Sequence, residues 1–170
     1  MTRKLILFLL ILLTGCVAIP QGIEPVRGFD VSRYLGTWYE IARLDHPFER
    51  GLEKVSAQYS LRDDGGIDVL NRGYDPRAGV WKQVRGRAYF VGDPQTGRLK
   101  VSFFGPFYGG YNVIDLDRKD YAHALVCGPD RSYLWILARS PGMDESAKDS
   151  LIRKAKAFGF ETEKLIFVRH

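Results

Sequence analysis

The sequence predicts an all-β domain of eight consecutive antiparallel strands followed by one helix. Segments of about six to ten residues alternate apolar and polar side chains at period two, and clusters of glycine, proline and aspartate separate them. Aromatic residues are plentiful, at 13% of the chain. The 170 residues, 45% of them apolar, suffice for one domain with a substantial core. An up-and-down barrel and a sandwich both fit this strand spacing.

The start of the chain is expected to be a signal rather than part of the domain. A positive end precedes an unbroken apolar run, residues 5–13, which is shorter than the roughly 20 residues of a membrane-spanning helix. The run ends in Leu-Thr-Gly-Cys, which looks like a bacterial lipoprotein box, so residues 1–15 are predicted to be a lipoprotein signal peptide. Cys16 would then receive a diacylglyceryl thioether and an N-acyl chain. An ordinary secretory signal with an incidental cysteine is the alternative.

Residues 16–28 are expected to be the acylated cysteine and a linker. This segment contains two prolines and too little apolar periodicity to fold by itself, so we expect it to tether the domain, residues 29–170, to the membrane surface. Val17 follows the cysteine. In lipoproteins of enterobacterial type an aspartate there retains the protein in the inner membrane, so its absence implies transfer to the outer membrane.

A short helical turn at residues 30–34 is expected to lead into the first strand, Gly36–Arg43. Gly36 lets the backbone turn tightly into a run of β-branched and aromatic residues. Period-two alternation predicts that four residues share one face: Trp38, Glu40, Ala42 and Leu44. Taken alone, this pattern fits a core tryptophan in any strand.

The remaining strands are delimited by turns whose glycines permit positive φ. They are expected at Glu53–Arg62, Ile67–Tyr74, Val80–Val91, Arg98–Phe104, Tyr111–Leu116, Tyr121–Cys127 and Ser132–Arg139. Residues 105–110, rich in glycine and aromatics, are expected to form a loop. Asp144 is the predicted N-cap of a helix that ends before Gly159 and carries an apolar stripe for the outside of the sheet. Residues 160–168 then return as an extended segment.

Three stretches resemble the lipocalin family, most closely its bacterial outer-membrane lipoproteins and more distantly apolipoprotein D. They are residues 36–43, 112–126 and 133–139, although the Thr-Asp-Tyr usual in the middle stretch is only loosely matched. In that family a first-strand tryptophan lies at the closed base of a barrel, with an arginine from the last strand across it. The resemblance therefore implies an eight-stranded up-and-down antiparallel barrel with its helix packed outside, and a base closed by Trp38 and Arg139 through a cation–π contact.

Strand parity selects most of the side chains expected to meet a ligand inside such a barrel, and the loop at residues 105–110 adds Tyr108. The predicted ligand-binding residues are Phe90, Phe103, Tyr108, Tyr111, Ala124, Val126, Trp135 and Leu137, with Tyr108 at the mouth. Such a lining accepts an alkyl chain, which gains about 0.8 kcal/mol per buried CH₂. The small residues Gly86, Ala88 and Ala124 are expected to leave room in the middle. A barrel filled by its own side chains, acting as an envelope scaffold, is the alternative.

The resemblance implies a binding protein for a lysophospholipid or a long-chain fatty acid, in lipid storage or transport for membrane maintenance under stress. The protein would be anchored to the outer membrane through Cys16 and face the periplasm; a homodimer is left open. The formal charge of +5 is too mild to indicate nucleic-acid binding. The three histidines show no metal-ligand spacing, and no cofactor motif is present, so neither metal nor cofactor is expected. An isomerase that uses Cys127 as nucleophile is the enzymatic alternative.

Overall fold

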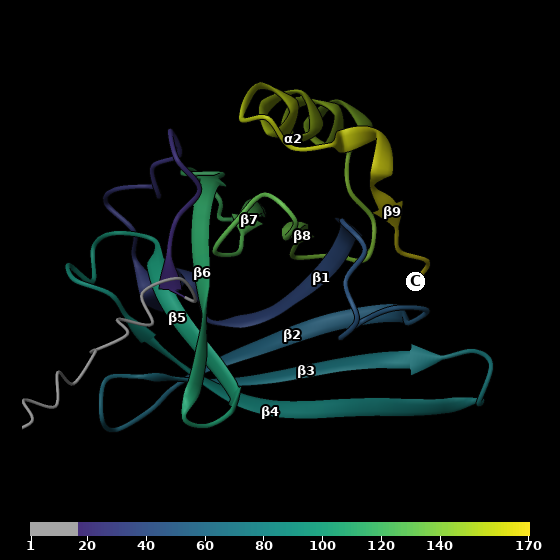
Figure 1. Cartoon of the computed structure of the whole chain (residues 1–170), viewed down its shortest axis with the longest axis horizontal. Coiled ribbons are helices and arrows are strands. Elements are labelled where there is room, and N and C mark those ends of the chain that lie inside the picture. Colours follow the sequence, from purple (N-terminus) through teal and green to yellow (C-terminus); the bar gives the residue numbers. More distant parts are fainter. Residues whose placement is uncertain (1–16) are drawn as a thin grey trace, which may run out of the picture.

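The fold is a closed eight-stranded antiparallel barrel, seen in a computed structural model that describes residues 17–170 (Figure 1). Each strand pairs with the next along the chain, and the first also pairs with the eighth, which closes the barrel and excludes the sandwich. The strands are β1 (Gly36–Arg43), β2 (Glu53–Leu61), β3 (Ile67–Asp75), β4 (Val80–Phe90), β5 (Arg98–Phe104), β6 (Phe107–Leu116), β7 (His123–Cys127) and β8 (Leu134–Ala138). The predicted signal peptide and Cys16 lie outside the described residues.

One helix lies outside the barrel, as predicted. Helix α2 (Glu145–Ala157) begins where the Asp144 carboxylate accepts a hydrogen bond from the backbone N–H of Ala147, and it ends at Phe158. Gly159 follows with φ of +83°, the left-handed conformation that suits glycine after a helix. Figure 1 shows α2 outside the barrel. Leu151 and Ala155 of this helix are buried in the cluster that lies against the outer face of the sheet. The chain then passes through the 3₁₀ turn η2 (Thr162–Lys164) to strand β9 (Ile166–Phe167), which pairs with β1.

Alternating side chains build two separate hydrophobic clusters. The inner cluster fills the closed end of the barrel and includes Phe29, Tyr34 and Trp38. The outer cluster lies between the sheet and α2 and includes Leu125, Ile136 and Leu151. Since Leu125 and Val126 fall in different clusters, strand β7 is buried on both faces. This explains why its sequence reads as a continuous apolar run.

The predicted inward face of β1 was partly wrong, because the strand contains a β-bulge. Glu40 pairs with Leu137 and Ala42 pairs with the next residue, Ile136, so Ile41 is an extra residue. Trp38 and Glu40 face the interior as expected, but Ala42 and Leu44 belong to the outer cluster. The bulge turns Arg43 inward instead.

Some predicted strand ends were wrong. Strand β6 begins at Phe107 rather than Tyr111, because Phe104 pairs with Phe107 and most of the expected loop is a tight hairpin. Strands β7 and β8 begin at His123 and Leu134, later than predicted. Tyr121 has φ of +53°, in the left-handed region, and so belongs to the turn before β7.

The segment from Val17 to Gly28 packs along the outside of the barrel. Ile23 is buried in the outer cluster, and the N–H of Val26 donates to the carbonyl of Val113 on β6 at 2.8 Å. These contacts hold the segment against the barrel, and its role as a membrane tether stays a prediction. The next residues form helix α1 (Val31–Tyr34), capped by Asp30, at the closed end. No helix among residues 17–170 is long and apolar enough to cross a membrane.

Candidate ligand cavity

The base of the barrel is closed by the contact that the sequence predicts. The guanidinium carbon of Arg139 lies 4.0 Å from the centroid of the Trp38 ring. Arg139 also donates hydrogen bonds to the carbonyls of Thr37 and Arg33. The Trp38 indole N–H donates to the carbonyl of Tyr34 at 2.8 Å. Nε of Arg139 donates to the carbonyl of Tyr121 in the turn before β7. The plug is therefore bound to backbone carbonyls of α1, β1 and that turn, and the indole is fully buried.

Above the plug lie two adjoining chambers, which share part of their lining. The inner chamber, of about 110 Å³, is bounded by apolar residues such as Ile67, Val69 and Leu99. The outer chamber, of about 540 Å³, lies at the mouth between the β1–β2 loop and the β5–β6 hairpin. Seven residues border both chambers: Glu49, Val55, Asn71, Val101, Phe103, Gly110 and Trp135. A concave, mostly apolar site of this size is typical of small-molecule binding.

Five of the eight predicted ligand residues border the cavity. Phe103 and Trp135 line both chambers, Tyr111 and Leu137 line the inner one, and Tyr108 borders the outer one. The ring of Tyr108 nevertheless packs near Tyr89 and under Lys100, whose side chains point to the outside of the barrel. Tyr108 thus lies at the rim of the outer chamber, with its ring close to Tyr89 and Lys100.

The other three predicted residues face inward but do not border the cavity. Phe90 packs edge-on against Phe29 in the closed end, at 6.2 Å between centroids. Ala124 and Val126 are fully buried and lie directly opposite the larger residues Leu137 and Trp135, which meet the cavity instead. A Cβ on Gly86 would lie 2.6 Å from the Phe103 ring, so that ring already occupies the room predicted there.

Three tyrosines form a polar floor, of which parity predicted only Tyr111 to face inward. The hydroxyl of Tyr111 lies 2.8 Å from that of Tyr34 and 3.0 Å from that of Tyr59, within hydrogen-bond distance of both. All three line the inner chamber. Burial raises the pKa of Tyr59 to about 12 and those of the other two well above the usual value of 10, so the floor is uncharged at neutral pH.

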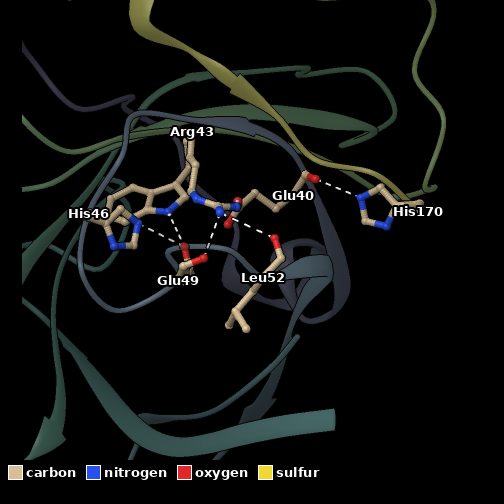
Figure 2. Close-up of polar contacts among 7 residues, drawn as sticks. Glu40, Arg43, His46, Glu49, Leu52 and His170 are labelled. Atoms are coloured by element: carbon tan, nitrogen blue, oxygen red, sulfur yellow. Dashed lines mark hydrogen bonds and ion pairs between the residues drawn. The ribbon is translucent and has the colours of Figure 1, made fainter. Parts of the chain in front are cut away.

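Four ionisable residues form a buried charge cluster beneath the β1–β2 loop (Figure 2): Glu40, Arg43, His46 and Glu49. The Arg43 guanidinium donates to Glu40 Oε1 at 2.5 Å and to the carbonyl of Glu49 at 2.8 Å. Nε2 of His46 lies 3.0 Å from Glu49 Oε2, and the Trp135 indole N–H donates to the same oxygen at 3.1 Å. The cluster therefore ties the mouth loop to β1 and β8.

The pKa values of the two carboxyl groups of the cluster are shifted in opposite directions. Burial raises the pKa of Glu40 well above 4.5, and the negative charge of Glu49 raises it further, against the opposing effect of Arg43. Burial also disfavours ionisation of Glu49, but hydrogen bonds from His46, Glu40 and Trp135 outweigh it and lower its pKa. The pKa values of the two carboxyl groups are thus pushed apart, so that negative charge is favoured on Glu49 over Glu40.

The cavity also holds polar atoms without a partner among the described residues. They are Nδ1 of His46, which is 3% exposed, and Oδ1 of Asn71. His46 lines the outer chamber, and Asn71 lines both chambers. Buried polar atoms are normally hydrogen-bonded, so these two are available to a polar group of a ligand or to water.

The sequence carried a signal for part of this cluster. Glu40 shares the predicted inward face with Trp38, and a carboxylate on a core face needs a partner. The partner could not be identified, because Arg43 has outward parity unless a bulge intervenes. His46 and Glu49 lie in a loop, where period-two reasoning does not apply.

Cys127 lies away from the cavity. It belongs to the outer cluster and is fully buried, and burial raises the pKa of its thiol to about 12. Within residues 17–170, no group of three or more His, Cys, Asp or Glu side chains is arranged to hold a metal ion.

Comparison with known proteins identifies the family. The model of the lipocalin-like domain matches residues 29–170. The chain belongs to the lipocalin family. It is 63% identical to an outer membrane lipoprotein Blc of Citrobacter freundii over 150 residues, which cover 88% of this chain and 84% of that protein. It is 33% identical to apolipoprotein D of Mus musculus over 149 residues, 83% of this chain and 77% of that protein.

The fold of this lipocalin also matches solved structures. Insecticyanin from the tobacco hornworm Manduca sexta superposes with a TM-score of 0.72, at 24% identity, over 90% of this chain and 87% of that one. The likeness to bacterial outer-membrane lipoproteins and to apolipoprotein D, predicted from three stretches of sequence, is confirmed. Lipocalins are in general binding and transport proteins for small hydrophobic ligands, which agrees with an apolar cavity closed at one end.

Proposed function

We propose that this lipocalin holds the acyl chain of a lysophospholipid or a long-chain fatty acid in its barrel. The observation that carries the proposal is the apolar cavity, which is open at the mouth and closed at Trp38. An alkyl chain in the inner chamber would exchange water for Val69, Leu99 and other apolar side chains. The head group would lie in the outer chamber, near the unpartnered atoms of His46 and Asn71.

The site of action is proposed to be the outer membrane, with the domain facing the periplasm. Relatives named outer membrane lipoprotein support this, together with the lipoprotein box that ends at Cys16. Acyl chains on Cys16 would provide stable anchoring, since two lipid signals normally suffice. A role in storing or moving lipids during membrane maintenance under stress follows from this location and from the proposed ligand.

Binding without catalysis is the reading that the cavity favours. Cys127, the nucleophile of an isomerase, borders neither chamber, and its thiol pKa of about 12 leaves very little thiolate at neutral pH. A solid barrel acting as an envelope scaffold is disfavoured by an outer chamber of about 540 Å³.

A matched pair of substitutions on β5 tests the location of the ligand. Val101 borders both chambers, whereas its neighbour Lys100 points to the outside. Val101→Trp should weaken lysophospholipid binding at least tenfold, about 1.4 kcal/mol, and Lys100→Trp should leave it unchanged. Native mass spectrometry of the protein extracted from its own membrane should show a bound lipid in wild type and Lys100→Trp only. Equal affinities in both variants would reject a ligand inside the barrel.

A further inference from the structure

The described chain begins beside the mouth of the barrel. The carbonyl of Ala18 accepts a hydrogen bond from the side-chain amide of Asn112 at 3.3 Å, and the same amide donates to the carbonyl of Gly128 at 3.2 Å. Gly128 and Pro129 belong to the β7–β8 turn, which borders the outer chamber. Asn112 is fully buried. Ala18 is therefore held at the mouth side by a rigid polar contact.

The rest of the segment fixes this course along the barrel. Arg131 donates to the carbonyl of Gln21 at 2.7 Å, and Ile23 is buried in the outer cluster. Further along, Val26 pairs with β6, and Phe29 joins the inner cluster at the closed end. The segment thus runs from the closed end towards the mouth as the chain is followed back to its start.

This course limits where a lipid anchor can leave the domain. Cys16 precedes Ala18 by two residues, so their Cα atoms are separated by at most roughly 7 Å. Acyl chains attached to Cys16, as the proposed function requires, would therefore leave the protein near the mouth and far from the closed base.

The rim of the mouth carries exposed phenylalanines from two separate loops. Phe48 in the β1–β2 loop is 74% exposed, and Phe104 and Phe107 at the tip of the β5–β6 hairpin are 69% and 78% exposed. All three border the outer chamber. Such a grouping of large apolar side chains marks an interaction surface. Arg72 and Lys82 border the same chamber and suit the anionic head groups of a bilayer.

We propose that the mouth of the barrel faces the membrane that holds the acyl chains of Cys16. Phe48, Phe104 and Phe107 enter the bilayer interface, so a lipid passes between bilayer and cavity without crossing water. The partner is a bilayer rather than a second copy of the chain, because an anchor at this end keeps the rim at a high effective concentration of lipid. This proposal rests on the lipidation of Cys16 that the proposed function includes.

Spin labels at the two ends of the barrel test the orientation. The lipidated full-length protein is placed in vesicles of phosphatidylethanolamine and phosphatidylglycerol, with a nitroxide on Phe107→Cys. The matched label is on Leu61→Cys, which replaces another exposed apolar residue, at the β2–β3 turn of the closed end. Cys127 is buried and should not react. We expect oxygen to relax the label at 107 more than a water-soluble nickel complex does, and the reverse at 61.

Two results would overturn the orientation. In one, the label at 107 is as accessible to nickel as the label at 61. In the other, the label at 107 is shielded from both reagents and shows spin–spin broadening that disappears on dilution with unlabelled protein, because a second copy covers the mouth. Lysophospholipid binding by the same samples separates this question from the proposed function. If the label at 107 lies in lipid but the protein does not bind lysophospholipid, the proposed function alone is rejected. If the protein binds lysophospholipid but the label at 107 is exposed to water, the orientation alone is rejected.

A serine variant supplies a second measurement that needs no label. Replacing Phe48, Phe104 and Phe107 together by serine should slow lysophospholipid uptake from vesicles at least tenfold. The affinity for monomeric lysophospholipid in solution should fall by less than the uptake rate does, because the three rings border only the outer chamber. Leu61→Ser is the matched control and should take up lipid at the wild-type rate. Equal uptake rates in all three proteins would contradict the proposal.

Discussion

Nη1 of Arg43 lies 2.5 Å from Oε1 of Glu40 inside the barrel. Residues three apart in a regular strand would instead point to opposite faces. The extra residue at Ile41 removes this conflict, because it shifts the alternation of β1 by one position. Ala42 and Leu44 then face α2, and Arg43 enters the mouth side of the interior (Figure 2). The bulge thus places the charge cluster between the Trp38 plug at the base and the β1–β2 loop at the mouth.

Removing Arg43 from the charge cluster should destabilise the protein strongly. Arg43→Met keeps the aliphatic stem but leaves the buried carboxyl of Glu40 without its ion-pair partner, and we expect a loss of about 3–5 kcal/mol in the free energy of unfolding. Urea unfolding followed by circular dichroism measures it. Arg50→Met, which breaks an exposed pair with Asp45, is the control and should leave the midpoint unchanged. Similar urea midpoints for the two variants would show that Arg43 does not stabilise the fold through the charge cluster.

Glu40 of the charge cluster should also make the stability of the protein depend on pH. Burial and the charge of Glu49 raise the pKa of Glu40 well above 4.5. The raised pKa of Glu40 adds to the free energy of unfolding. This contribution is fully present below about pH 4.5, the pKa in the unfolded chain, and it is lost as the pH rises through the pKa of the folded protein. Glu40→Gln keeps the neutral form, so above pH 4.5 its unfolding free energy should fall less steeply than that of wild type, by up to about 1.4 kcal/mol per pH unit. Glu24→Gln, on the surface, should keep the wild-type slope. Parallel slopes for Glu40→Gln and wild type would contradict the raised pKa.

The base plug allows a separate test of contact. Trp38→Ala should cost about 3–5 kcal/mol, as a large-to-small change in a closed core, and Arg139→Ala should cost less. The double variant should be less destabilised than the sum of the single ones, by about 0.5–2 kcal/mol for a cation–π pair. A cycle of Trp38→Ala with Lys164→Ala, on the exposed η2 turn, should be additive. Additivity in the first cycle as well would mean that the contact contributes nothing to stability.

The sequence predicted the fold and its base well, since both rest on local patterns. Period-two alternation, turn glycines and the Asp144 cap each act within a few residues, and the Trp38 and Arg139 stretches carry a family resemblance. The cavity wall was predicted less well, because parity gives the side of a strand but not the depth. Ala124 points inward as expected, yet Leu137 across from it is what meets the cavity. The charge cluster depends on one bulge and one loop, and neither has a signature in the alternation.

Tryptophan emission should report the ligand from inside the barrel. Trp135 lines both chambers, donates to Glu49 and lies 5.2 Å from the His46 ring, so a head group in the outer chamber would alter its surroundings. Trp38 is sealed in the base, and Trp81 lies outside, half-exposed near Arg72. Adding a lysophospholipid should therefore change the emission of wild type and of Trp81→Phe by similar amounts. Most of that change should be lost in Trp135→Phe, although binding persists by native mass spectrometry. A full response in Trp135→Phe, or its loss in Trp81→Phe, would place the lipid on the outer surface of the barrel instead.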